Sequence, residues 1–306
     1  MLLCPFHHQI VIHRWGWTLV VNPDGTTTAW NKNKTKVLHS HRPPPGPGNS
    51  PGGLAADRPN LPSGDRARRQ CRAGVIYRGL VRRIEADRAR VAMMASYQAV
   101  TDDVGKLRDD ELARPSRCQG WSRADLLFYL LLDAQRALVT FATPAAGEPD
   151  VDFISYWVPF RPGAEGYAGH ARFVRRVASS YQSDLVIAAQ WAETAAAATR
   201  AAALLPADVT VATQGHVLFA ADFLATLAVE ATIHHLDLAA GDKSLAGPSG
   251  PGLAVTRETL DGALGQPVPV AWDDVDYMLK ATGRAELTDG DRASLGVLAS
   301  RFPLLG

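Results

Sequence analysis

The chain of 306 residues is 46% hydrophobic, which is enough for one or two buried cores and excludes a chain that is disordered throughout. No stretch approaches the roughly 20 apolar residues of a membrane-spanning helix, and the N-terminus lacks the apolar region of a signal peptide. We therefore expect a cytoplasmic protein with no membrane partner. Three widely spaced cysteines, Cys4, Cys71 and Cys118, argue against a disulfide framework and favour reduced thiols.

The formal net charge of +1 hides an asymmetry between the two parts of the chain. Residues 1–92 carry 15 Lys and Arg against 5 Asp and Glu, whereas the rest carries 17 against 26. A basic arm joined to an acidic domain is one way to bind nucleic acid. Two unrelated segments joined together explain the same split, so nucleic acid is not favoured as a partner.

The N-terminal region has its own pattern. Residues 2–30 contain Cys4, His7, His8 and His13. With these residues the segment resembles the C-terminal end of the HNH endonuclease domain found in many actinobacterial proteins. The parts that complete an HNH site would lie before Met1, so we interpret residues 1–42 as a remnant of such a domain. Residues 43–74 are rich in Pro, Gly and Arg and predict a linker, because neither helix nor strand persists in such a segment. We expect this N-terminal region to be largely disordered.

From residue 75 onward, apolar residues recur at helical spacing. We predict helices over residues 75–106, from the N-cap Ser122 to residue 143, over 166–182 and 184–204, and from residue 215 to 240, before the C-cap Gly241. Long helices joined by short breaks predict a mainly α fold, an antiparallel four-helix bundle over residues 75–245. Residues 246–306 are predicted to add a small C-terminal α/β subdomain, with a hairpin over 268–287 and a last helix capped by Thr288.

One predicted helix carries a candidate site. Phe223, Leu227, Glu230, His234 and Asp237 are spaced four, three, four and three residues apart, so they share one helix face. The first two mark that face as turned inward, where an unpaired charge costs several kcal/mol. A divalent metal would compensate the charges, because Glu230 and His234 can bind one ion while Asp237 orients a ligand from behind. A buried Glu–His ion pair without metal explains the pattern equally well.

The other histidines and Cys118 are weaker candidates. His235 points to a different face, and we expect it at the rim or surface. His216 lies 18 residues before His234 on the same predicted helix, too far to share an ion. His170, on another helix, can approach the site in principle. Cys118 has no base near it in the sequence, so we expect an inert thiol.

The chain contains two motifs, Cys118-Gln-Gly-Trp121-Ser-Arg-Ala-Asp125-Leu-Leu and Glu230-x-x-x-His234-His-x-Asp237-Leu. They resemble motifs of the mycothiol-dependent maleylpyruvate isomerase family, which belongs to the DinB-like superfamily of metal-binding four-helix bundles. The resemblance spans roughly residues 93–245. It implies a metal, usually zinc, held by a His of the second helix and by Glu230 and His234. Tyr129 stands where the family has that first His. A phenol, with a pKa of about 10, is a poor ligand unless the metal deprotonates it.

The resemblance also implies a function. The metal would receive the thiol of mycothiol, or of a similar low-molecular-weight thiol, and hold it as a thiolate nucleophile for a small organic substrate. We therefore expect a metal- and mycothiol-dependent isomerase or thiol transferase, with an activity that Tyr129 could impair. Two alternatives stay open: a non-catalytic DinB-like bundle that binds a small molecule or a partner, and an HNH-type protein that processes nucleic acid.

Overall fold

The computed structural model describes residues 18–21, 27–30, 34, 37–39, 83–158, 167–206 and 208–305. The chain divides into two units, residues 1–74 and 75–306, and each is described by itself. In the first unit, strands β1 (Thr18–Val21), β2 (Thr27–Trp30) and β3 (Val37–His39) form an antiparallel sheet in that order. The sequence did not predict these strands. The four histidine and cysteine positions of the HNH resemblance, and the linker over 43–74, lie outside the described residues.

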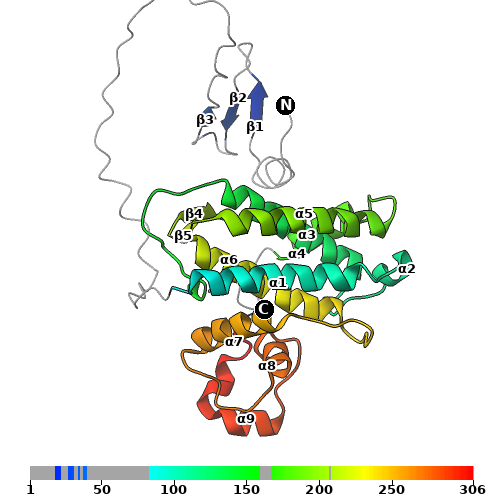
Figure 1. Ribbon diagram of the computed structural model, residues 1–306, viewed down its shortest axis with the longest axis vertical. Helices are drawn as coiled ribbons and strands as arrows, with labels where there is room; N and C mark the ends of the chain where they lie inside the picture. The colour runs from blue at the N-terminus through cyan, green and yellow to red at the C-terminus, as the bar shows by residue number, and fades with distance from the viewer. Residues whose placement is uncertain are drawn as a thin grey trace, which may run out of the picture. The chain divides into compact units, whose positions relative to one another are not determined.

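Four long helices form the core of the second unit (Figure 1): α1 (Ala86–Val104), α3 (Arg123–Phe141), α5 (Asp184–Leu204) and α6 (Ala220–Leu238). Helix α1 packs against α5 and α6, and α3 packs against the same two helices, so the four stand at the corners of a square. The mainly α class and the four-helix bundle are confirmed.

Helices α1 and α6 run side by side in the same direction. At their first turns the Ile84 amide donates to Asp222 Oδ1 at 3.2 Å, and at their last turns His235 Nε2 lies 3.0 Å from Asp103 Oδ2. Asp222 is fully buried, and its second carboxylate oxygen has no hydrogen-bond partner among the described residues.

Helix α3 runs opposite to α6, because Tyr129 meets Glu230 near the start of α3 while Phe141, at its end, packs on Phe223 with ring centroids 5.8 Å apart. Helix α5 runs opposite to α1. The antiparallel arrangement therefore holds for α3 with α6 and for α1 with α5, and the other two neighbouring pairs are parallel. The parallel pair α3 and α5 needs a connection that returns along the bundle, and the segment with helix η2 (Ser155–Trp157) and α4 (Tyr167–Ala178) supplies it.

Side-chain caps fix where helices begin. The Ser122 hydroxyl accepts a hydrogen bond from the Asp125 amide at 3.0 Å, and the Asp125 carboxylate accepts one from the Ser122 amide at 2.9 Å. This reciprocal capping box satisfies two amides at the start of α3, and the predicted N-cap at Ser122 is confirmed. The short helix α2 (Asp109–Leu112) lies between α1 and α3.

The helix predicted from residue 215 begins five residues later in the structure, at Ala220. A hairpin of β4 (Thr210–Thr213) and β5 (His216–Phe219) precedes it. Its two-residue turn, Gln214 and Gly215, has φ of 49° and 89°, the positive values that a tight hairpin turn requires. The prediction that His216 shares a helix with His234 is therefore wrong. His216 lies on β5 and does not contact His234.

Among the described residues of the last 60, the regular elements are all helices. Helices α7 (Gly250–Leu264), α8 (Asp274–Ala281), α9 (Asp289–Leu295) and η3 (Gly296–Arg301) follow one another, and α7 packs on α1 and α6. The predicted α/β character and the hairpin over 268–287 are wrong here, because Asp273 caps α8 and starts a helix that buries Tyr277 and Met278. The predicted cap at Thr288 is confirmed.

Close contact between α7 and the bundle depends on one glycine. A Cβ at Gly252 would lie 2.2 Å from Ser96 Oγ and 2.4 Å from Thr232 Oγ1, so only glycine lets α7 approach α1 and α6 this closely. Among the described residues, no helix is both long and apolar enough to cross a membrane.

Candidate functional site

Three of the residues predicted for the site come together where α3 faces α6. The Tyr129 hydroxyl donates a short hydrogen bond to Glu230 Oε1, and the same oxygen lies 3.4 Å from His234 Nε2. The Tyr129 ring meets the His234 ring edge-on, with centroids 5.0 Å apart. The side chains of Glu230 and His234 are 16% and 15% exposed, so the pair is mostly enclosed but reachable from solvent.

Asp237 supports His234 from the opposite side of the imidazole ring. Its Oδ2 lies 3.0 Å from His234 Nδ1, and its side chain is fully buried. The Arg284 guanidinium donates to both oxygens of the same carboxylate, from Nε to Oδ1 at 2.8 Å and from Nη2 to Oδ2 at 2.7 Å. Asp237 therefore contacts His234, and its role in orienting a metal ligand stays a prediction.

Cys118 also reaches this cluster, because the loop before α3 folds over the end of α6. The Cys118 thiol donates to Asp237 Oδ2 at 3.4 Å and lies 3.9 Å from His234 Nδ1. The Arg117 amide donates to the Asp237 carbonyl at 3.0 Å and holds the loop there. The sequence shows no titratable group close to Cys118, whereas the structure brings His234 and Asp237 to it from a helix more than 100 residues away in the chain.

Burial and hydrogen bonds set the charge of each group. Burial disfavours a charged Glu230, but hydrogen bonds from His234 and Tyr129 outweigh this and lower the pKa of its carboxyl. Burial likewise opposes a charged His234, while its contacts with Asp237, Cys118 and Glu230 raise its pKa well above the ordinary value. Burial, together with the negative charges of Glu230 and Asp133, raises the pKa of Tyr129 well above its ordinary value. These pKa shifts make Glu230 and His234 an ion pair, with the neutral phenol of Tyr129 beside it.

The sequence reasoning missed two residues of this region. Asp133 lies one turn after Tyr129 on α3, and burial, with the nearby negative charge of Glu230, raises its pKa to about 8. The sequence contains a signal for Asp133, because it lies four residues after Tyr129 and therefore on the same face of the helix. Arg284 follows Asp237 by 47 residues and has no local pattern that points to the site.

The remaining histidines are placed as follows. The ring of His170, on α4, packs edge-on against Tyr129 with centroids 5.8 Å apart, so it does approach the site. His216, on β5, has Nδ1 3.1 Å from Asp150 Oδ2. The prediction that His235 lies at the rim is wrong: it is 1% exposed and bonded to Asp103, because the chain leading into α7 covers that face of α6.

The donor atoms of Glu230 and His234 suit a divalent metal. Two ligands of a tetrahedral zinc ion, each at about 2.0–2.1 Å, lie about 3.3–3.4 Å apart. Glu230 Oε1 and His234 Nε2 are 3.4 Å apart, which fits this spacing. Asp237 Oδ2 contacts the other imidazole nitrogen, Nδ1, as a carboxylate commonly does beside a metal-bound histidine. Tyr129 does not suit a ligand in this arrangement, because its protonated phenol donates to the carboxylate oxygen that would bind the ion.

A second grouping lies on the other side of the same imidazole. One ligand atom each of Cys118, His234 and Asp237 lie within 4.8 Å of one another. Asp237 Oδ2 already accepts hydrogen bonds from Arg284 and Cys118 and contacts His234, and the guanidinium repels a cation. The Glu230 side of His234 is therefore the better candidate for a metal.

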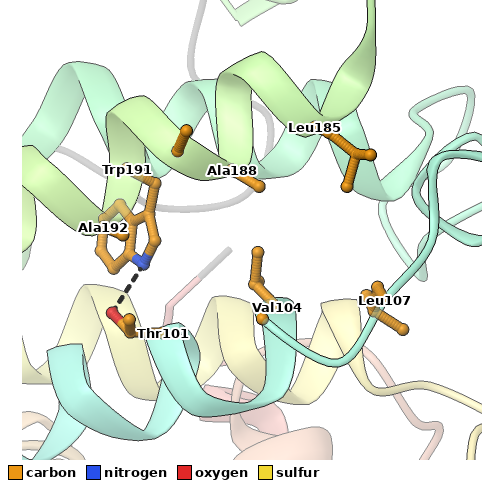
Figure 2. Close-up of a pocket in the computed structure, with 9 residues that line it drawn as sticks. Thr101, Val104, Leu107, Leu185, Ala188, Trp191 and Ala192 are labelled. Carbon is orange, nitrogen blue, oxygen red and sulfur yellow. Dashed lines mark hydrogen bonds between the residues drawn. The ribbon is translucent and has the colours of Figure 1, made fainter.

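An apolar pocket lies apart from this site, between the end of α1 and the start of α5 (Figure 2). Val104 and Leu107 face Leu185 and Ala188 across it, and Trp191 Nε1 donates to Thr101 Oγ1 at 3.0 Å at one end. None of its lining residues belongs to the Glu230–His234 site.

The fold and the site define a helical bundle in which α3 and α6 enclose the carboxylate–imidazole pair of Glu230 and His234. Residues 93–239 match the family model described as the mycothiol maleylpyruvate isomerase N-terminal domain, and the match includes both motifs and the whole of the Tyr129–Glu230–His234–Asp237 cluster. Two solved structures are similar, the mycothiol-dependent maleylpyruvate isomerase and a histidine-to-alanine variant of it. Each has 16% sequence identity and a TM-score of 0.44, and covers 61% of this chain and 72% of the other. No curated protein matches the chain.

Proposed function

We propose that the unit of residues 75–306 binds one divalent metal ion, zinc in the first place, through Glu230 and His234. The metal would activate a low-molecular-weight thiol such as mycothiol for isomerisation of, or transfer to, a small organic substrate. The observation that carries this proposal is the 3.4 Å separation of Glu230 Oε1 and His234 Nε2, with Asp237 behind the imidazole. The family match over residues 93–239 supports the choice of a thiol.

A bound metal would supply the positive charge that lowers the pKa of a thiol and keeps it as a thiolate. The protein would supply the ligands and their orientation. Glu230 and His234 would hold the ion, and Asp237 would accept a hydrogen bond from His234 Nδ1. Two protein ligands leave positions open for the thiol and for water or substrate. Tyr129 would act as a wall of the site and as a hydrogen-bond donor to Glu230, and a role as third ligand stays a prediction.

One observation favours a second candidate, a non-catalytic bundle. The Tyr129 hydroxyl and His234 already satisfy Glu230 Oε1, so the site is stable as an ion pair without metal. Such a protein would bind a small molecule or a partner and perform no thiol chemistry. The HNH alternative rests on residues outside those described and stays a prediction.

The test is the metal content of the full chain, purified without a metal-chelating tag and measured by elemental mass spectrometry. We expect equimolar zinc in the wild type and in His216→Ala, a control for a histidine outside the site, and loss of zinc in Glu230→Ala and His234→Ala. The zinc-loaded protein should then bind mycothiol in a calorimetric titration. No metal in the wild type after zinc is added back would contradict the proposal and favour the non-catalytic bundle.

A further inference from the structure

The buried carboxylate behind His234 is held by a residue from outside the matched family domain. Arg284 follows α8, well beyond residue 239, where the family match ends. It donates to both oxygens of Asp237, at 2.8 Å and 2.7 Å, in the two-pronged geometry in which a guanidinium fixes the plane of a carboxylate. Its side chain is 17% exposed and that of Asp237 is fully buried.

The backbone around Arg284 is fixed by the end of α8. The Arg284 and Ala285 amides both donate to the Leu279 carbonyl, at 2.7 Å and 2.9 Å. Gly283 makes the turn with a φ of 70°, a conformation that favours glycine. The Leu304 amide donates to the Ala281 carbonyl at 2.7 Å, which ties the C-terminal residues to the same turn. Arg284 therefore projects from a rigid support.

The contacts form a continuous path to the candidate metal position. Arg284 fixes the plane of Asp237, Asp237 Oδ2 lies 3.0 Å from His234 Nδ1, and His234 Nε2 lies 3.4 Å from Glu230 Oε1. A hydrogen bond to one imidazole nitrogen fixes the ring orientation and directs the other nitrogen. Without the guanidinium, the carboxylate has lost its two-pronged anchor and can turn away from the ring.

We propose that Arg284 is a positioning residue, which holds Asp237 so that His234 presents Nε2 to the site, and that the C-terminal helices are therefore a working part of the site. The part of this inference that concerns metal affinity rests on the proposed function, whereas the orientation of the ring does not. It assigns a role to a segment that lies outside the family match.

The first test follows the hydrogen-bonded Nδ1 proton of His234 by NMR in the metal-free full chain, assigned by its loss in His234→Gln. We expect a slowly exchanging signal in the wild type that disappears in Arg284→Gln. The matched control is Arg257→Gln, because Arg257 also holds an acidic residue and a carbonyl in the C-terminal helices, Asp274 and the Trp272 carbonyl, away from the site. This control should keep the signal.

The second test measures zinc affinity by competition with a chelator. Arg284→Gln should raise the dissociation constant about 10- to 100-fold, the usual cost of losing a residue behind a metal ligand, while Arg257→Gln should not change it. Arg284→Lys keeps the charge but loses the two parallel bonds, so it should behave like Arg284→Gln.

The outcomes separate this inference from the proposed function. A wild type that binds no zinc, combined with loss of the ring proton in Arg284→Gln, overturns the proposed function and supports the positioning role. An unchanged ring proton in Arg284→Gln overturns the inference, whatever the metal result. Loss of the signal in Arg257→Gln as well would also overturn it, because it would show an effect of general packing. Full retention of the signal and of zinc affinity in Arg284→Lys would overturn it too, because it would show that positive charge alone is sufficient.

Discussion

Replacement of Tyr129 by phenylalanine should strengthen metal binding at the site. The Tyr129 hydroxyl donates to Glu230 Oε1, the atom that would bind the metal, so the ion has to displace this hydrogen bond. A hydrogen bond to a charged group contributes about 1.5–3 kcal/mol. Since about 1.4 kcal/mol corresponds to a factor of ten, its removal should lower the zinc dissociation constant by about 10- to 150-fold.

The assay is a zinc titration in competition with a chelator, run on the wild type, Tyr129→Phe and Tyr129→His. The histidine variant should bind more tightly than the phenylalanine variant, because it removes the competing hydroxyl and adds an imidazole where the family has one. Tyr181→Phe is the matched control, because its hydroxyl bonds Gln190 at 2.7 Å on an exposed surface away from the site.

The result that would refute this reasoning is weaker zinc binding by Tyr129→Phe. It would mean that the metal deprotonates the phenol, despite the raised pKa of Tyr129, and takes it as a third ligand. An unchanged affinity would mean that the hydrogen bond does not compete with the metal.

Two further predictions concern stability, and urea unfolding tests both. Burial raises the pKa of Asp222 from 3.8 to about 7, so the folded state keeps a proton that the unfolded state loses. The free energy of unfolding should therefore fall as the pH rises from about 4 to about 7, by up to about 4 kcal/mol at about 1.36 kcal/mol per pKa unit. Asp222→Asn should flatten this pH dependence. Parallel pH profiles of the wild type and the variant would contradict the raised pKa of Asp222. Gly252→Ala places a Cβ 2.2 Å from Ser96 Oγ and should destabilise the fold by about 1–3 kcal/mol. Gly250→Ala, at the start of the same helix with nothing within 4 Å, should change little, and equal unfolding midpoints of the two variants would show that α7 can shift to make room.

The sequence predicted the candidate site where the information lies within one helix. The spacing of Glu230, His234 and Asp237 requires that they share a face, and the apolar residues before them show that this face is turned inward. The capping box at Ser122 is equally local, because both of its hydrogen bonds join residues three apart. Such features follow from helix geometry whatever the rest of the chain does.

Features that depend on neighbouring elements were not predictable in the same way. His235 lies on the second face of α6, and that face is buried because α1, α7 and the chain before α7 pack against it. His216 was assigned to a helix because its neighbours are apolar, while the turn at Gln214 and Gly215 starts a hairpin instead. Arg284 reaches Asp237 across 47 residues, a contact that the periodicity of one helix cannot indicate.

The state of the site depends on competition at a single atom, Glu230 Oε1. In the structure this oxygen contacts both the Tyr129 hydroxyl and His234, and a metal ion would have to displace the phenol to bind it. The support on the other side of the imidazole, from Asp237 and Arg284, is intact and does not depend on residue 129. A thiol that binds only the metal-loaded form would raise the apparent metal affinity by mass action, so we expect the Tyr129 hydrogen bond to weaken metal binding without abolishing it. The thiol and the metal should therefore bind cooperatively, and zinc titrations with and without mycothiol measure that coupling directly.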